Sequence, residues 1–444
     1  MDLGRIPAVR DDVHILRVKT PERQRVVLCL ASKGKEITPS EDTCHLITLC
    51  DGTHTVEEIV SHFVEISGED PSSVEPQLEK IFERLVAVEV IQFYDVPTPR
   101  EIPPEVELVH SLEHIVMEIT NACNLDCIHC YNDSGHKIRD ELALTEFYKV
   151  INEMKNLGVL RITLSGGEPL LHPQFFEIAQ YIRDQGLELG LFTNGTLLTR
   201  NVAKTLKDLS FLKVTVSVDS LTPDVHDYFR GRKGAWKKTM EGINHLKAEG
   251  IPIKPAVALS KFNKAEIVDL LTFFLEQGFN DYQLMPVFAT GRKVPLDFDI
   301  SPEEYEKVAK DVFILEKKYK TKPHSFTGKK KTVNCGVGTY SLVIKSNGDV
   351  VPCPAFGRRV LVGNVKDQSL KSIWNDSPLL NQLRNLDCHN HPVCKTCDVL
   401  EYCRGGCIAN VCLRTGRLEV CDPYTCAYVR ASTYAAECTE KMTE

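Results

Sequence analysis

The stretch Cys123-Asn-Leu-Asp-Cys127-Ile-His-Cys130 places three cysteines at the spacing C-x3-C-x2-C. Three thiolates can bind three irons of a [4Fe–4S] cluster and leave the fourth iron open to another ligand. An open coordination position is typical of a reactive metal site, whereas a structural site has all its positions filled by the protein. The triad alone is also compatible with a zinc ion, so its interpretation depends on the surrounding sequence.

The cysteines lie between a predicted strand and a predicted helix. Residues 115–120 form an apolar, strand-like run, and residues 142–156 have the periodicity of an amphipathic helix. A second apolar run starts at Arg161 and ends in Gly166-Gly167-Glu168-Pro169. Glycines at the end of a buried strand allow a ligand to approach the backbone closely, although a tight turn into the next helix explains them equally well.

The triad and the later Gly-Gly-Glu-Pro sequence together resemble the radical S-adenosylmethionine (SAM) superfamily over residues 113–320. The resemblance implies that SAM binds the open iron, and that one electron from the cluster cleaves SAM to methionine and a 5′-deoxyadenosyl radical, which abstracts a substrate hydrogen. It also implies that Gly166, Gly167 and Glu168 hold the amino end of SAM and that His129 lies beside the adenine. An external electron donor such as flavodoxin or ferredoxin is then a required partner.

Strand and helix patterns continue to alternate through the middle of the chain. Further strands are predicted at 187–194, 213–220, 251–260 and 282–287, and further helices at 200–209, 235–249, 264–277 and 302–318. Six strand–helix units predict an α/β fold, a partial (β/α)6 radical SAM barrel with its site at the carboxyl ends of the strands. Asn194, Ser217 and Asp219 follow such strand ends. The resemblance implies that they contact SAM, with ordinary helix capping as the alternative.

Composition narrows the class of protein further. The chain has 444 residues, a formal net charge of −8 and 43% hydrophobic residues, which is sufficient for about three domains. The negative charge argues against nucleic-acid binding, and the lack of a long apolar run or signal peptide argues against a membrane protein. Seventeen cysteines favour thiolate ligation in a reducing compartment over disulfides, so we expect a cytoplasmic protein.

Most of the cysteines follow the predicted barrel. The block Cys394-x2-Cys397-x5-Cys403-x3-Cys407 alone is compatible with a zinc ribbon. Extended by Cys335, Cys353 and Cys426, the series resembles the SPASM extension of radical SAM enzymes, which carries two auxiliary iron–sulfur clusters, expected here as [4Fe–4S]. The resemblance implies an outer cluster bound by Cys394, Cys397, Cys403 and Cys426, and an inner cluster bound by Cys335, Cys353 and Cys407 with an undetermined fourth ligand. Cys421 is an alternative to Cys426, and Cys388 and Cys412 are further local thiols.

Residues 1–97 are predicted to form a separate domain, because the proline-rich segment from Pro97 to Pro104 is typical of a linker, which we place at 98–112. Strands at 25–30 and 85–92 and helices at 41–49, 55–66 and 74–84 predict a winged-helix-like α+β domain. Their order and the sequence from Asp51 to Ile59 resemble PqqD-like domains, which bind the leaders of ribosomally made precursor peptides by adding a strand to a sheet edge. The barrel then occupies residues 113–320 and the Cys-rich SPASM domain residues 321–444.

These patterns favour a radical SAM oxidoreductase that crosslinks or oxidises a precursor peptide. The alternative is a SPASM-type enzyme that acts on a small molecule such as a tetrapyrrole side chain, because the carboxyl-terminal motifs fit both. A zinc-ribbon binding protein without catalytic turnover is disfavoured by the Gly166–Pro169 sequence and by the six strand–helix units.

Overall fold

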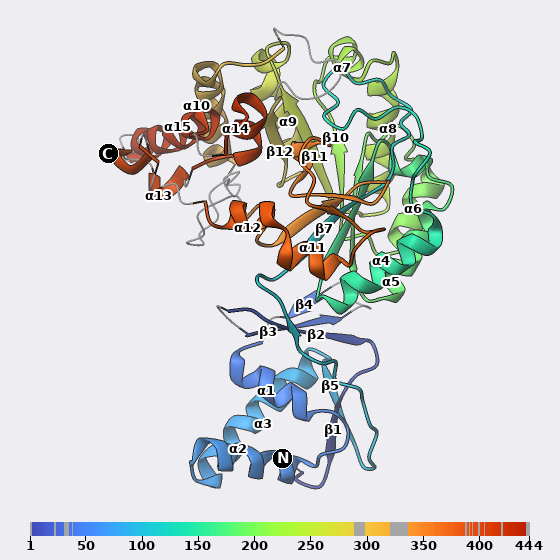
Figure 1. Ribbon diagram of the computed structural model, residues 1–444, viewed down its shortest axis with the longest axis vertical. Helices are drawn as coiled ribbons and strands as arrows, with labels where there is room; N and C mark the ends of the chain where they lie inside the picture. Colours follow the sequence, from blue (N-terminus) through green and yellow to red (C-terminus); the bar gives the residue numbers. More distant parts are fainter. Residues whose placement is uncertain are drawn as a thin grey trace. The chain divides into compact units, whose positions relative to one another are not determined.

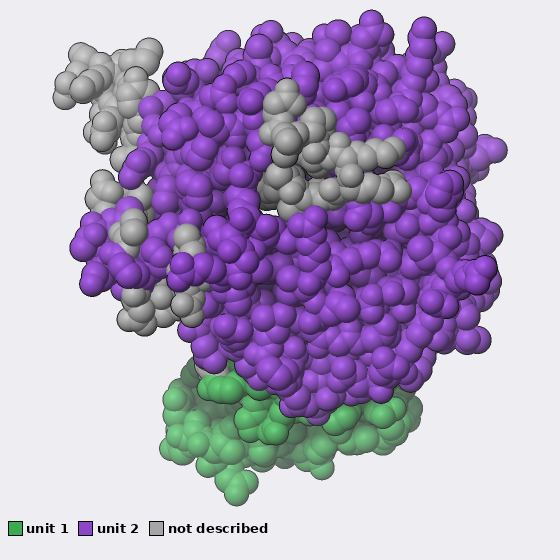
Figure 2. Space-filling view, turned by 45° about the horizontal axis from the view of Figure 1, so that its top comes forward, with its two compact units in different colours: residues 1–111, 154–160, 182–188 green, residues 112–153, 161–181, 189–444 purple. Residues whose placement is uncertain are grey.

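The computed structural model describes residues 2–21, 24–30, 35–37, 39–287, 298–319, 336–386, 389, 391–392, 394–397, 400–403, 405–418 and 421–440. The predicted ligand Cys335, the thiol Cys388 and the predicted domain boundary at 320 lie outside these residues. The chain divides into two compact units (Figure 2). Unit 1 contains residues 1–111, 154–160 and 182–188, and unit 2 contains residues 112–153, 161–181 and 189–444.

Unit 1 is an α+β unit with its own apolar core. Strand β1 (Ile6–Val9) pairs with β5 (Ile91–Tyr94), and a second sheet has the order β4 (Lys35–Ile37), β3 (Gln24–Leu30), β2 (Val13–Lys19), β6 (Val106–Glu107). The helices are α1 (Glu41–Leu49), α2 (Val56–Ser67) and α3 (Pro71–Ala87). Side chains of the strands and all three helices, including Leu28, Leu46, Ile59 and Phe82, are buried together.

Local sequence signals explain the helix limits of unit 1. Helix α2 begins with a capping box between Thr55 and Glu58 and ends at Gly68, which has a left-handed φ of 68°. Helix α3 runs three residues beyond the predicted 74–84, because Leu85 continues its buried face. The strand predicted at 85–92 is correspondingly wrong in its first half, and only its end belongs to β5.

The segment predicted as a linker makes ordered contacts within unit 1. The amide of Thr98 donates to the carbonyl of Gly52 at 2.8 Å, and β6 pairs in parallel with β2. A Cβ atom on Gly52 would lie 1.9 Å from the Thr98 carbonyl oxygen, and Gly52 has a φ of 76°. The turn at Asp51-Gly52 therefore requires glycine both for its backbone conformation and for this close approach.

The central sheet of unit 2 contains the six predicted barrel strands as neighbours in chain order. They are β7 (His114–Thr120), β8 (Arg161–Gly166), β9 (Glu188–Thr193), β10 (Lys213–Ser217), β11 (Ile253–Leu259) and β12 (Gln283–Pro286). The helices after them are α4 (Leu144–Asn156), α5 (Phe175–Asp184), α6 (Arg200–Asp208), α7 (Pro223–Arg230), α8 (Ala235–Ala248), α9 (Ile267–Glu276) and α10 (Pro302–Lys318) (Figure 1). The predicted α/β barrel class is confirmed, and α5 and α7 are helices for which the sequence analysis gives no range.

The carboxyl-terminal region extends the same sheet beyond β7. Strand β13 (Ser341–Ile344) pairs in parallel with β7, and β14 (Asp349–Val351) and β15 (Gly363–Asn364) follow in antiparallel pairs. The remaining helices are α11 (Leu370–Asp376), α12 (Pro378–Arg384), α13 (Leu400–Cys403), α14 (Ile408–Thr415) and α15 (Pro423–Glu440), the last of which packs on α10. The cysteine-rich region is thus built onto the strand that leads into Cys123. Within the described parts of the chain, none of the helices is long and apolar enough to cross a bilayer.

Candidate radical SAM active site

The three cysteines of the C-x3-C-x2-C loop are half-buried just beyond the carboxyl end of β7. The amide of Cys123 donates to the carbonyl of Gly135 at 3.0 Å, which anchors the start of the loop. Burial, with smaller contributions from Cys127, Glu168 and Cys130, raises the pKa of the Cys123 thiol to about 12, although a hydrogen bond from the Leu125 amide opposes the shift. Three sulfurs whose negative charges would repel one another fit a group that supplies positive charge, as the irons of a cluster do.

The end of α7 contacts this loop through both a side chain and the backbone. The guanidinium of Arg230 lies 3.9 Å from Cys127 Sγ and 2.7 Å from Asp219 Oδ2, and the Asp126 amide donates to the Arg230 carbonyl at 3.2 Å. A Cβ atom on Gly231 would lie 2.2 Å from the Asp126 carbonyl oxygen. This close backbone contact therefore requires glycine at position 231, where φ is 64°.

Arg230 and Asp219 form a buried ion pair beside Cys127, with side chains 9% and 0% exposed. Burial alone would raise the pKa of Asp219, but Arg230, with His129 and His226, outweighs burial and lowers it. Burial likewise raises the pKa of Cys127, while Arg230 opposes this effect and favours the thiolate. The sequence patterns do not indicate that Arg230 belongs to the site. The one local signal is the sequence Arg230-Gly231-Arg232, in which a glycine lies between two arginines.

Gly166 and Gly167 pack directly against the start of the cysteine loop. A Cβ atom would lie 2.2 Å from the Thr120 carbonyl oxygen at Gly166, and 2.2 Å from the Ala122 carbonyl oxygen at Gly167. The Gly167 amide donates to the carbonyl oxygen of Thr120 at 2.8 Å. The close approach of the loop backbone is therefore sufficient to explain why both residues are glycines. Their contact with SAM stays a prediction.

Glu168 is fully buried and connects two strand ends. Its carboxylate accepts hydrogen bonds from Thr193 Oγ1 and the Asn194 amide, both at 2.8 Å. Burial raises its pKa to about 7, although these hydrogen bonds oppose the shift. Asn194 in turn donates to Asn124 Oδ1 at 2.9 Å, so the end of β9 is joined to the cysteine loop.

His129 lies against Phe229 and Phe298, with ring centroids 5.5 and 6.2 Å away. Its Nδ1 atom is buried and has no hydrogen-bond partner among the described residues. Burial lowers the pKa of His129 to about 4, which keeps the ring neutral. A neutral aromatic ring with an unused nitrogen fits the predicted place beside a nucleobase. Ser217 is half-buried at the end of β10, and its contact with SAM, like that of Asp219, stays a prediction.

Two of the three predicted inner-cluster ligands lie on elements that contact each other. Cys353 precedes η3 (Pro354–Phe356) and Cys407 precedes α14, and η3 packs against α14. The third, Cys335, lies outside the described residues.

The predicted outer-cluster ligands form two neighbouring pairs. Cys394 and Cys397 pack with Cys421 in one apolar cluster, whereas Cys403 Sγ lies 4.0 Å from Cys426 Sγ. Helix α13 contacts both η5 (Cys394–Thr396) and α15, which places the two pairs close together. Cys421, considered only as an alternative, is therefore next to the first pair.

Models of two known protein families match this chain, one over the barrel and one over the cysteine-rich region. The model of the radical SAM superfamily matches residues 117–274, and that of an iron–sulfur cluster-binding domain, SPASM, matches residues 335–398. The chain is 32% identical over 340 residues to an AdoMet-dependent heme synthase of Methanosarcina barkeri, covering 71% of this chain and 96% of the relative. It is 28% identical over 364 residues to the subtilosin biosynthesis protein AlbA of Bacillus subtilis, covering 80% of this chain and 81% of AlbA. The structure of Streptococcus suis SuiB bound to its precursor peptide SuiA has a TM-score of 0.65 at 16% identity, covering 94% of this chain and 99% of SuiB.

The chain belongs to the radical SAM superfamily. It is a SPASM-type radical SAM enzyme, and its cofactors are SAM and iron–sulfur clusters, including auxiliary clusters. The likeness of residues 1–97 to PqqD-like domains is not tested by these comparisons and stays a prediction.

The described residues have different roles at the site of the SAM-binding cluster. When bound, the cluster and SAM supply the electron transfer and the radical that takes a hydrogen from the substrate. Cys123, Cys127 and Cys130 would hold the cluster, and Arg230 holds a positive charge beside Cys127. Glu168 holds the end of β9, which is joined to the loop through Asn194 and Asn124, so buried side chains position this part of the site.

Proposed function

We propose that this enzyme is a maturase that crosslinks or oxidises a ribosomally made precursor peptide, with unit 1 holding the peptide and the barrel abstracting a hydrogen from it. The auxiliary clusters then take up the electron that an oxidative modification releases. The proposal rests on how the chain is covered by its two kinds of relative, and on the sheet of unit 1.

The coverage of this chain by its relatives favours the peptide alternative over the small-molecule alternative. The heme synthase matches over 96% of its own length but leaves 29% of this chain uncovered, since it covers 71%. SuiB covers 94% of this chain, so much of the excess has a counterpart in the fold of a protein solved with a precursor peptide. This difference in coverage carries the proposal, because a peptide-binding module would account for the part of this chain that the heme synthase does not match.

The sheet of unit 1 offers a place for such a peptide. Strand β4 is at the end of its sheet, and among the described residues it pairs only with β3, in the register Leu28 with Ile37 and Leu30 with Lys35. The outer side of an end strand presents backbone N–H and C=O groups, which an extended peptide can pair with. We therefore place the precursor peptide along β4.

A tetrapyrrole substrate is the second candidate. The 32% identity to a heme synthase favours it, and that relative is matched over nearly its whole length. In that case the barrel and auxiliary clusters would act on a side chain of the tetrapyrrole, and unit 1 would serve another purpose.

Anaerobic assays with both substrate classes distinguish these functions. The reconstituted enzyme would be incubated with SAM, a reductant, and either the peptide encoded by a short neighbouring reading frame or an iron coproporphyrin. Liquid chromatography with mass spectrometry would record deoxyadenosine and the mass of each substrate. A mass change of the peptide alone supports maturation, and a change of the porphyrin alone refutes it.

Proline substitutions test the place of binding. Backbone N–H groups of neighbouring strand residues point to opposite sides, so Glu36→Pro and Ile37→Pro each remove one, and one of the two faces outward. We expect the outward variant to keep its fold and lose at least tenfold in peptide affinity by calorimetry. Glu101→Pro, at an exposed position without regular structure, is the matched control. Unchanged affinity in both strand variants would place the peptide elsewhere.

A further inference from the structure

An exposed basic turn joins α7 to α8 and contacts the cysteine loop. The turn contains Arg232 and Lys233, and Lys237 and Lys238 follow at the start of α8. All four residues are exposed. They form a positive surface on a chain whose formal net charge is −8, and we call these four residues the basic patch.

The basic patch adjoins the loop beside two of the three cysteines. Arg232 Nη1 donates at 2.6 Å to the carbonyl of Asn124, the residue after Cys123. Asp126, the residue before Cys127, is exposed, and its backbone packs against the start of the turn. The basic patch therefore lies at the molecular surface next to the place where these cysteines would hold the SAM-binding cluster.

Asp227 fixes the shape of the turn. Its carboxylate accepts hydrogen bonds from the Trp236 amide at 2.8 Å and from the Gly234 amide. Gly234 has a left-handed φ of 82°, and its carbonyl accepts from the Lys238 amide at 3.3 Å. The charge of Asp227 is thus directed at the backbone of the turn, and the basic side chains extend from a preformed support.

The positive charge of the basic patch is only partly balanced by its neighbours. The exposed acidic residues of the same elements are Asp126 in the loop, Asp224 at the start of α7 and Glu241 one turn further along α8. No ion pair joins the three lysines of the patch to another described residue. Exposed cations of this kind attract an acidic partner over several ångströms, and salt weakens the attraction.

We propose that the basic patch is the docking surface for a reduced ferredoxin, a small acidic protein that delivers the single electron required for SAM cleavage. In this step a ferredoxin cluster is oxidised by one electron and the SAM-binding cluster is reduced by the same electron, with no proton or group transferred. Ferredoxins have the low reduction potential that this transfer needs. Complexes of electron carriers bury little surface, so a patch of four residues is sufficient.

The proposal rests on the radical SAM class of the chain. It does not depend on whether the substrate is a peptide or a tetrapyrrole, because both reactions need the same electron. Failure of the peptide assay would therefore leave the docking surface untouched, and failure of docking would leave the choice of substrate untouched.

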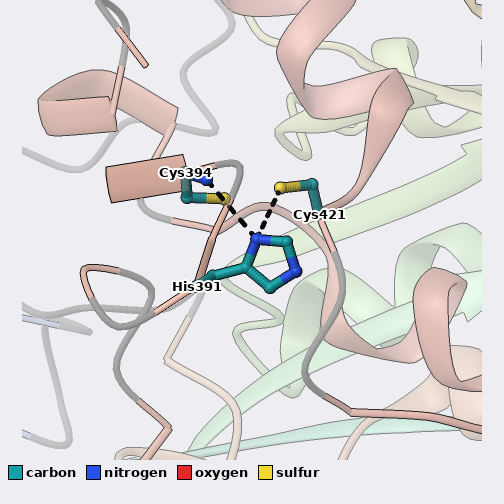
Figure 3. Close-up of side chains that lie close together, drawn as sticks. All are labelled: His391, Cys394 and Cys421. Carbon is teal, nitrogen blue, oxygen red and sulfur yellow. Dashed lines mark hydrogen bonds between the residues drawn. The ribbon is translucent and has the colours of Figure 1, made fainter. Parts of the chain in front are cut away.

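The cysteine-rich region is the competing place for a carrier. There His391 Nδ1 lies 3.3 Å from Cys421 Sγ and accepts from the Cys394 amide at 3.4 Å (Figure 3). Lys395, next to Cys394, is exposed. A carrier bound beside Lys395 would exchange electrons with an auxiliary cluster, whereas the basic patch adjoins the loop of the SAM-binding cluster. Lys395→Glu therefore distinguishes the two places.

Protein-driven and chemically driven reduction separate docking from catalysis. The triple variant Lys233→Glu/Lys237→Glu/Lys238→Glu reverses three charges of the basic patch. With a reduced bacterial two-cluster ferredoxin as donor, at low salt and below saturation, we expect deoxyadenosine formation to fall by at least about tenfold. Added salt should slow the ferredoxin-driven wild-type reaction in the same direction. With dithionite as donor, the variant should form deoxyadenosine at the wild-type rate.

A matched control carries the same change of charge elsewhere. Lys80→Glu/Lys149→Glu/Lys371→Glu alters exposed residues of α3, α4 and α11, and we expect it to keep the ferredoxin-driven rate. Carbodiimide, which joins a lysine amine to a carboxylate in contact with it, locates the complex directly. Mass spectrometry of the crosslinked wild type should find ferredoxin attached to lysines of the basic patch.

Several outcomes would overturn the proposal. They are an unchanged ferredoxin-driven rate in the triple variant, an equal loss with dithionite, the same loss in the control, and loss of rate or crosslinking at Lys395 instead. Reduction by flavodoxin with no reduction by ferredoxin would also overturn it. If the triple variant does not fold, the corresponding lysine-to-glutamine variant decides: we expect a smaller loss in the same direction, and an unchanged rate rejects docking at the basic patch.

Discussion

Lys345 Nζ in β13 lies 2.8 Å from Glu118 Oε1 in β7, and the two side chains are 0% and 1% exposed. Asn132, which follows the cysteine loop, completes the group: it accepts from Lys345 Nζ at 2.8 Å and donates to Glu118 Oε2 at 2.8 Å. The three side chains are thus buried and hydrogen-bonded to one another. The carboxyl-terminal strand is thereby fixed to the barrel strand that leads into Cys123.

Removal of one charge from this group should be strongly destabilising. Lys345→Met leaves Glu118 buried and unpaired, so we expect a loss of about 3–5 kcal/mol in unfolding free energy. The double variant Lys345→Met/Glu118→Gln should recover part of that loss, because no charge remains buried. Anaerobic denaturant unfolding of the two variants measures the difference, and equal stabilities would contradict the ion-pair explanation.

Arg230 should control how well the SAM-binding cluster is held. Arg230→Lys keeps a positive charge but loses the planar group that spans Asp219 and Cys127. We expect a loss of about 10–100-fold in deoxyadenosine formation, the usual effect of changing a residue that supports a metal ligand. Arg200→Lys, on an exposed turn of α6, is the control. Iron content measured on the same samples shows whether the loss arises from cluster binding.

Glu168 should make stability depend on pH. Its folded pKa of about 7 is above its ordinary value of 4.5, so folding favours the protonated acid. The stability that this group contributes is present below pH 4.5 and is lost as the pH rises through 7, by about 3 kcal/mol. Glu168→Gln lacks this titration. The difference in melting temperature between wild type and variant should therefore change between pH 5 and 8, and a constant difference would disprove the shift.

Periodicity was sufficient to predict the barrel because its strands are buried runs separated by amphipathic helices. The helix at Pro302–Lys318 has the predicted limits, since Ser301 and Glu304 form a capping box that is visible in the sequence. The short strands β13 to β15 were not predicted, because two to four residues carry no periodicity. Strand β13, which joins the other two to the barrel, pairs with β7 more than two hundred residues earlier.

The site was predictable to the extent that its residues are close in sequence. The Cys123–Cys130 loop and Gly166–Glu168 are local motifs, whereas Arg230 owes its position to a tertiary contact. A positive charge beside Cys127 is recognised only when α7 is placed against the loop.

The whole enzyme should bind three clusters. We expect roughly twelve irons after anaerobic reconstitution if all are [4Fe–4S] clusters. Replacing Cys123, Cys127 and Cys130 together with Ala should remove about a third of the iron and all deoxyadenosine formation, because these residues hold the cluster that cleaves SAM. Iron near zero with stoichiometric zinc in the wild type would refute the cluster assignment.

The outer auxiliary cluster should be needed for product but not for SAM cleavage. Cys394→Ala/Cys397→Ala removes two of the ligands predicted for the outer cluster. An oxidative modification must dispose of an electron after hydrogen abstraction, so we expect deoxyadenosine at nearly the wild-type rate and no modified substrate. Cys412→Ala, on a half-buried thiol of α14 outside the predicted ligand set, is the control and should form product normally.

A purely structural role of the same cysteines predicts a different outcome. Cluster binding also contributes folding free energy, so loss of the outer cluster could simply unfold the carboxyl-terminal region. That region supplies β13 and Lys345, which are fixed to β7, and its unfolding would also abolish SAM cleavage. Deoxyadenosine and product must therefore be measured on one folded sample. Product at the wild-type yield, in a variant that Mössbauer spectroscopy shows to lack the outer cluster, would rule out its role as electron acceptor.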